Sequence, residues 1–115
     1  MTDKEQNKVQ EILRELRSIA NVEKKGANGR ELPPSVVQFR SSINRLEETL
    51  NNEGLLTELI RDIFRDNRLF VLSQKDDEAK KKKYDDSACY YIWQEISEIM
   101  TGIVNDLEAE LDTIR

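Results

Sequence analysis

The chain has 115 residues and a net charge of −5, and 37% of its residues are hydrophobic while 36% are charged. This is the size of one domain that can bury a core without disulfides or metals. The sequence has no histidine and a single cysteine, Cys89, which excludes an internal disulfide, a zinc site built from Cys and His, and a histidine general base.

The first predicted helix covers about residues 2–24. Thr2 and Glu5 have the spacing of a capping box, and apolar residues then recur every three or four positions up to about Val22. Two glycines and a Pro-Pro pair follow, and they predict a connection that ends where a second helix begins near Pro34.

The second predicted helix covers about residues 34–51 and carries a short heptad-like seam of apolar residues. An Asn-Asn-Glu-Gly turn then predicts an antiparallel hairpin with a third helix at about 54–72. This third helix ends in Leu69–Leu72, four consecutive apolar residues that we interpret as a helix end buried on several sides. If they are exposed, they mark an interaction patch.

Residues 73–86 form a charged connecting segment with five basic and five acidic side chains in blocks. The composition is typical of a solvated loop. Ser73 and Asp76 could instead cap a helix, and nothing breaks one between Asp76 and Ser87. The last helix is therefore expected to start either at about residue 77 or at 87.

The last predicted helix, ending at about residue 114, has a stripe of apolar residues at steps of three and four, widened to the width of a globular core face. A helix of this length cannot bury its stripe alone, so we predict an all-α, single-domain bundle of about four helices packed along it. The predicted core comprises Leu13, Leu16, Phe39, Ile43, Leu46, Leu59, Ile63, Ile92, Ile96, Ile99, Ile103 and Leu107. We expect the substitution Ile99→Ala to cost about 2 to 4 kcal/mol.

The net negative charge is located at the end of this helix. Residues 1–94 carry 17 basic and 17 acidic side chains, whereas residues 95–115 carry six acidic side chains and Arg115. Such a strip is either a solvated outer face or a site for a basic partner. No apolar run approaches the roughly 18 to 20 residues that span a membrane, and the first residues do not have the order of a signal peptide. We expect a soluble, cytoplasmic, acidic protein.

The sequence contains only weak motifs for catalysis or metal binding. We therefore predict no enzyme activity and no catalytic, cofactor-binding or metal-binding residues. Cys89 lies at an apolar position of the stripe and is interpreted as a small core residue. The pair Glu95 and Glu98 has the i, i+3 spacing found in all-α Mg²⁺-dependent nucleotide hydrolases, but no second acidic pair repeats it. That class is the least favoured alternative.

The preferred hypothesis is a small interaction protein, an adaptor, inhibitor or assembly subunit, whose partner is another protein or a second copy of itself. Aromatic and apolar anchors with a charged rim are typical of such contacts. Two stretches have this character. The one that we favour comprises Tyr90, Tyr91 and Trp93, beside the Lys80–Lys83 run. The other comprises Leu69 and Phe70, beside Arg65 and Arg68. The alternative is a helical subunit of a nucleic-acid-associated complex, which would use Arg61, Arg65, Arg68, Lys80, Lys81, Lys82 and Lys83.

Overall fold

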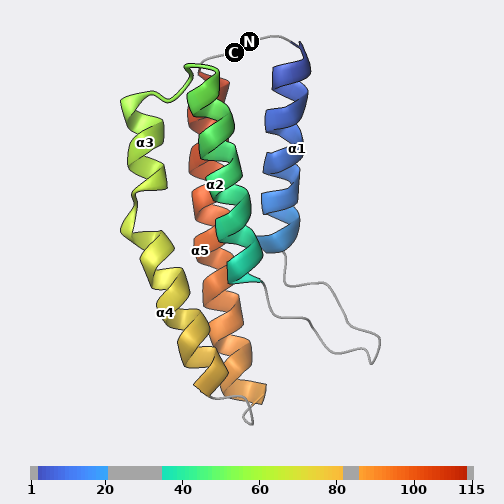
Figure 1. The fold of residues 1–115 in the computed structure, drawn as a ribbon. Coiled ribbons are helices and arrows are strands. Elements are labelled where there is room, and N and C mark those ends of the chain that lie inside the picture. Colours follow the sequence, from blue (N-terminus) through green and yellow to red (C-terminus); the bar gives the residue numbers. More distant parts are fainter. Residues whose placement is uncertain (1–2, 21–34, 82–85, 114–115) are drawn as a thin grey trace.

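The computed structural model describes the backbone of residues 3–20, 35–81 and 86–113, and the side chains of these residues except Glu5 and 86–90. The described residues are all-α and contain no strand (Figure 1). The helices are α1 (Asp3–Ala20), α2 (Val36–Asn52), α3 (Glu58–Phe64), α4 (Asn67–Lys81) and α5 (Asp86–Asp112). The predicted capping pair Thr2 and Glu5, the predicted end of the first helix and the connection before Pro34 lie outside the described residues and side chains.

The helices occupy four positions of an antiparallel bundle. Helix α1 packs against α2 and α5, α2 packs against α1 and α4, and both α3 and α4 pack against α5. Helices α3 and α4 follow one another along the same position, and α5 extends along the whole bundle (Figure 1). The prediction of an all-α bundle packed along a long C-terminal helix is therefore confirmed.

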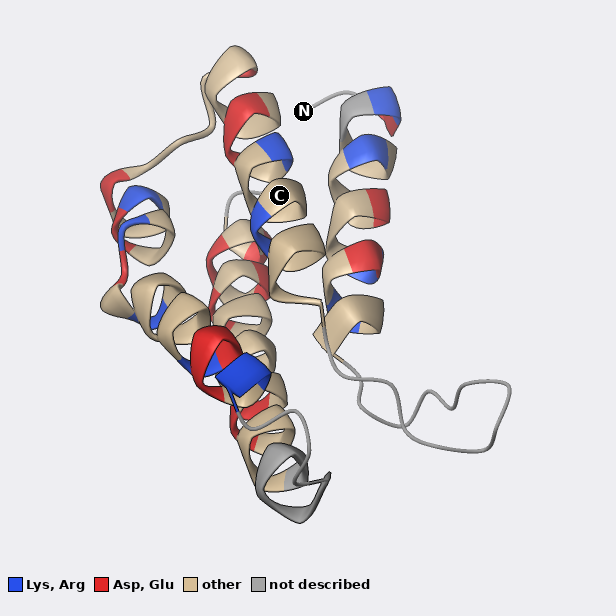
Figure 2. Cartoon of the chain, turned by 60° about the horizontal axis from the view of Figure 1, so that its bottom comes forward, with Lys and Arg blue, Asp and Glu red and all other residues tan. Residues whose placement is uncertain are grey.

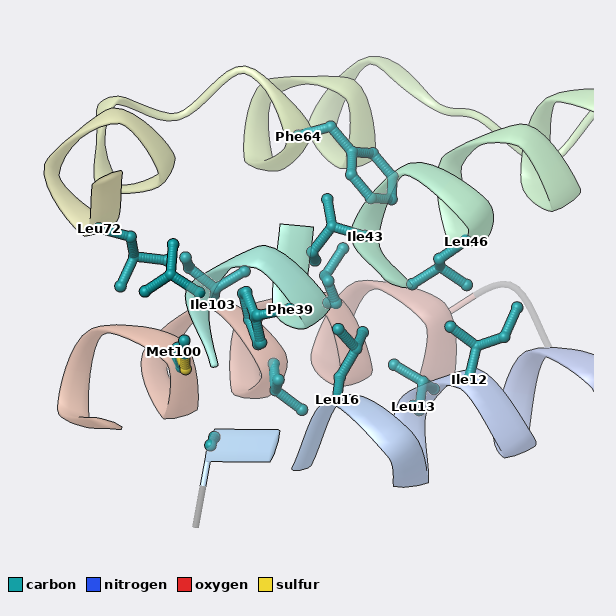
Figure 3. Packing of buried hydrophobic residues seen from close by; sticks show 14 of the residues in the cluster. Ile12, Leu13, Leu16, Phe39, Ile43, Leu46, Phe64, Leu72, Met100 and Ile103 are labelled. Atoms are coloured by element: carbon teal, nitrogen blue, oxygen red, sulfur yellow. The ribbon is translucent and has the colours of Figure 1, made fainter. Parts of the chain in front are cut away.

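The core is a single cluster to which all five helices contribute. Figure 3 shows Leu13, Phe39, Phe64, Leu72 and Ile103, one from each helix, pointing into the same interior. Each comes from the apolar stripe of its own helix, and complete burial of a side chain of this size stabilises the fold by about 1.5 to 3 kcal/mol. The apolar periodicity of the sequence thus identifies most of the inner faces of α1, α2 and α5.

The turn between α2 and α3 fixes where α3 begins. Gly54 has a φ of 67°, and its N–H donates to the carbonyl of Asn51 while the N–H of Leu55 donates to that of Leu50. This pair of bonds is the Schellman motif that ends a helix at a left-handed residue. The hydroxyl of Thr57 then accepts a hydrogen bond from the N–H of Ile60 and caps the start of α3.

The predicted third helix, 54–72, is two helices, because the chain caps itself at Asp66. The N–H of Asp66 donates to the carbonyl of Ile63 at the end of α3, and its carboxylate accepts a hydrogen bond of 2.8 Å from the N–H of Arg68 in α4. An aspartate at this position satisfies a backbone donor that a new helix leaves open. The apolar run Leu69–Leu72 consequently begins α4 and does not end a helix.

Most of the predicted charged connecting segment belongs to α4, which continues to Lys81. Of the two predicted starts of the last helix, about residue 77 and residue 87, the first is wrong and the second is confirmed to within one residue, since α5 begins at Asp86. The extension of α4 is supported by its neighbours: Lys75 forms an ion pair with Glu95 of α5, Ala79 is buried, and Asp76 pairs with Lys80 one turn later. These contacts add to the helix propensity of the Lys, Gln, Glu and Ala residues in this segment.

Nine of the twelve predicted core residues are buried, and three are not. Leu59 is 61% exposed, because α3 is a short helix that turns only Ile60 and Phe64 fully inward. Ile63 and Ile99 are partly buried at the edge of the cluster. The loss on Ile99→Ala is therefore expected near or below the lower end of the range of about 2 to 4 kcal/mol, since a partly buried side chain removes less surface from the core. None of the described helices is long and apolar enough to cross a lipid bilayer.

Candidate functional site

Two acidic side chains near the C-terminal end of α5 form ion pairs with arginines of other helices in the bundle. Asp106 accepts a hydrogen bond of 2.7 Å from the guanidinium group of Arg68 in α4, and Glu108 accepts one of 2.8 Å from Arg17 in α1. Asn105 accepts a second bond from Arg17. The acidic strip is thus partly neutralised by arginines of the neighbouring helices, which weakens the case for a basic partner at this end.

Arg68 connects the break between α3 and α4 to α5. The Arg68 guanidinium lies 3.1 Å from the carboxylate of Asp66 as well as 2.7 Å from that of Asp106. The backbone N–H of Arg68 holds the pKa of the Asp66 carboxyl below its ordinary value, burial opposes this shift, and the guanidinium group lowers the pKa further. Asp66 therefore stays ionised and keeps Arg68 aligned with α5.

A surface with exposed apolar side chains lies where α2 meets α4. The Arg40 guanidinium of α2 donates hydrogen bonds to the hydroxyl of Ser73 and the carbonyl of Leu69 in α4. Val37, three residues before Arg40, is 71% exposed, and Phe70, three residues before Ser73, is 59% exposed. Residues three apart on a helix are neighbours on its surface, so both apolar side chains lie beside the Arg40 contact. We name Val37, Arg40, Phe70 and Ser73 the α2–α4 surface.

The favoured aromatic site is only partly defined. Tyr91 is 68% exposed on α5, whereas Trp93 is partly buried and packs against the core cluster. Tyr91 lies one turn before Glu95, whose carboxylate pairs with Lys75 of α4. The side chain of Tyr90 and the residues Lys82 and Lys83 lie outside the described parts. Of the three predicted aromatic anchors, Tyr91 is thus exposed to solvent, Trp93 is partly buried, and the side chain of Tyr90 is not described.

A hollow of about 640 Å³ opens between α2 and α3. The α2 wall carries Asn44, Glu47, Glu48 and Asn51, the α3 wall carries Arg61 and Arg65, and Leu56 is the apolar residue of the lining. It exists because α3 packs against α5, whereas α2 packs against α1 and α4. Each of the two helices carries both blue and red stretches in Figure 2, and the residues that line the hollow are acidic on α2 and basic on α3. The acidic wall was not predicted, since Glu47 and Glu48 resemble ordinary outer-face residues until α3 is placed beside them.

The residues of the nucleic-acid alternative do not form one surface in the described structure. Arg61 and Arg65 line the hollow, while Arg68 turns to α5 and is held between two carboxylates. Lys80 pairs with Asp76, at the far end of α4. Ion pairs with carboxylates oppose the phosphate contacts that this alternative requires.

The side chain of Cys89 lies outside the described parts. Glu95, one member of the predicted Mg²⁺-binding pair, forms an ion pair with Lys75, and Glu98 is exposed. Among the side chains that the structure describes, which exclude those of Glu5 and of residues 86–90, no group of three or more acidic or cysteine side chains is placed to hold a metal ion.

No family model matches the chain, and neither a curated protein nor a solved structure is similar enough to match it. A proposal about function must therefore be based on the positions and contacts of this chain's own residues.

Proposed function

We propose that the protein is a small non-enzymatic interaction protein that binds another protein through the α2–α4 surface. The observation that supports this most is the exposure of Phe70. An aromatic ring that is 59% exposed in the first turn of a packed helix leaves apolar area in water, and such area is a common anchor in protein contacts.

The exposure of Phe70 follows from helix geometry. Successive residues of a helix are rotated by about 100°, so the four apolar residues Leu69–Leu72 cannot all face one core. Leu72 is fully buried and Leu69 is partly buried. Phe70 is consequently directed outward from a helix whose backbone its buried neighbours hold in place. Little backbone entropy is therefore lost when a partner binds there.

The neighbouring groups match a contact site with a charged rim. Val37 adds a second exposed apolar side chain from α2, and Arg40 lies between the two helices with its guanidinium bound to Ser73 and Leu69. Arginine and aromatic residues are enriched in binding hot spots, while rim charges mainly set orientation and association rate. The surface therefore has anchors from two rigid helices.

The test uses the immobilised protein and its alanine variants. We expect Phe70→Ala to weaken partner binding by about 1 kcal/mol or more. Leu59→Ala is the matched control, because Leu59 is equally exposed but lies on the flank of α3 away from Arg61. Equal retention of the bound proteins by Phe70→Ala and by the wild type would contradict the proposal for this surface.

Tyr91 provides a second arm of the same experiment. It is one of the three aromatic anchors that the sequence favours, and it is the most exposed aromatic side chain among those described. If Tyr91→Ala and not Phe70→Ala releases the partner, the contact lies on α5 beside the Lys75–Glu95 pair. Circular dichroism of each variant shows whether helicity is unchanged, so that lost binding is not lost folding.

A further inference from the structure

The walls of the α2–α3 hollow carry opposite charges. Glu47 and Glu48 line it from α2, and Arg61 and Arg65 line it from α3. Among the described residues, no ion pair joins the two walls. Two cations and two anions therefore face one hollow without neutralising each other across it.

We propose that the hollow binds a second copy of this chain in a two-fold symmetric dimer, in which Arg61 and Arg65 of each copy face Glu47 and Glu48 of the other. This inference rests on the proposed function as an interaction protein, and it names the partner of this one site. The α2–α4 surface remains the site of the other partner.

The charge pattern has the property that two-fold symmetry requires. In such an interface the same patch occurs on both copies, so that if residue i contacts residue j, then j also contacts i. A patch with two acids on one helix and two arginines on the next meets this condition, because rotation places each acidic wall opposite a basic wall. A patch of one sign would repel its own copy.

The shape of the molecule leaves the two walls open to a second copy. Helix α3 packs against α5 and stands apart from α2 at one edge of the bundle (Figure 1). The open sides of two hollows can therefore face each other, with the α3 wall of one copy opposite the α2 wall of the other. Leu56 supplies apolar surface there, which is partly buried already.

The lining argues against a small apolar ligand. The volume lies in the range of small-molecule pockets, but those are lined mainly by apolar and aromatic side chains. Here all the lining residues other than Leu56 are polar or charged. Arginine and carboxylate groups pair bidentately, which favours a protein surface with the complementary pattern.

A charge-swap experiment tests the dimer directly. Sedimentation velocity over a range of concentrations should show self-association of the wild type that weakens at high ionic strength. The variant E47R/E48R makes both walls basic, and R61E/R65E makes both walls acidic. We expect each variant alone to raise the dissociation constant at least about tenfold, because like charges then face each other. An equimolar mixture should restore association, since each wall again meets its opposite.

Charge-matched controls separate local from general electrostatic effects. E11R/E98R changes the net charge as much as E47R/E48R does, and K8E/R14E matches R61E/R65E, with all four residues exposed on α1 or α5. These controls should associate like the wild type. Thermal melts verify that each variant is folded. If the reversed charges unfold the chain, E47Q/E48Q replaces E47R/E48R as the test of the acidic wall. This variant removes the attraction without adding repulsion and should still weaken the dimer.

Two results would overturn the dimer. One is a wild type that stays monomeric at every concentration at low ionic strength, and the other is association that the folded swap variants leave unchanged or that their mixture does not restore. Neither affects the α2–α4 surface, whose test is the loss of a different bound protein on Phe70→Ala. A failed dimer with Phe70-dependent binding refutes only this inference, whereas a dimer without Phe70-dependent binding refutes only the α2–α4 proposal.

Discussion

The guanidinium group of Arg68 lies 2.7 Å from the carboxylate of Asp106, across the junction between α4 and α5. Arg68 is also the residue whose N–H is capped by Asp66, one residue before the start of α4. The break between α3 and α4 and the attachment of α4 to α5 therefore share one side chain.

We expect Asp66→Ala to destabilise the protein by about 1 kcal/mol, since a helix N-cap is lost. Asp66→Asn is the control, because asparagine caps equally well without the charge. Chemical denaturation at neutral pH measures both. A loss for Asn as large as that for Ala would show that the ion pair with Arg68, and not the cap, carries the effect.

The stability contributed by the charge of Asp66 should depend on pH. Its folded pKa is lowered below the ordinary value of 3.8, so the unfolded chain binds the proton more readily. This contribution is fully present above about 3.8 and is lost as the pH falls through the lower, folded pKa. The difference in unfolding free energy between wild type and Asp66→Asn should therefore narrow at acid pH. A difference that widens there would contradict the sign of the shift.

Gly54→Ala should destabilise the protein by about 1 kcal/mol, because alanine is strained at the left-handed φ of 67°. No other atom lies within 4 Å of the position of an added Cβ, so the cost is conformational and not steric. Gly54→Asn should lose less, since asparagine tolerates this conformation better. Equal losses for Ala and Asn in thermal melts would argue against this cause.

Gly102→Ala should instead stabilise the protein by about 0.5 to 1 kcal/mol, because glycine inside a helix is unfavourable relative to alanine. The added Cβ would lie 3.4 Å from Nη1 of Arg68, which is the mobile end of a side chain. A loss of stability would mean that the methyl group displaces Arg68 from Asp106. Repeating the substitution in an Arg68→Met background would identify that cause.

Three alanine substitutions test how the core is assigned. Leu72→Ala should cost about 2 to 5 kcal/mol, because Leu72 is fully buried. Phe70→Ala, two residues away, should change stability by no more than about 0.5 kcal/mol. Ile99→Ala should fall between them, since Ile99 is partly buried. A large loss at Phe70 would show that its ring is part of the core and would remove it as an anchor.

The sequence by itself determined the helical class and most of the inner faces. Apolar residues at steps of three and four mark Leu13, Phe39, Ile43 and Ile103 as inward without any reference to their neighbours. The sequence also contains a signal for the break between α3 and α4. Asp66 and Asn67 precede an apolar run as an N-cap does, but apolar residues continue on both sides and made one longer helix the simpler prediction.

Only the tertiary structure decided which exposed residues meet. The helical state of residues 73–81 is supported by the ion pair of Lys75 with α5 and by the burial of Ala79, and local propensity does not contain such contacts. The opposition of Glu47 and Arg61 across the hollow likewise depends on where α3 lies, because charges on separate helices carry no periodic relation to each other in the chain. Periodicity reports the face that a helix buries, whereas packing alone sets what stands beside the face that it exposes.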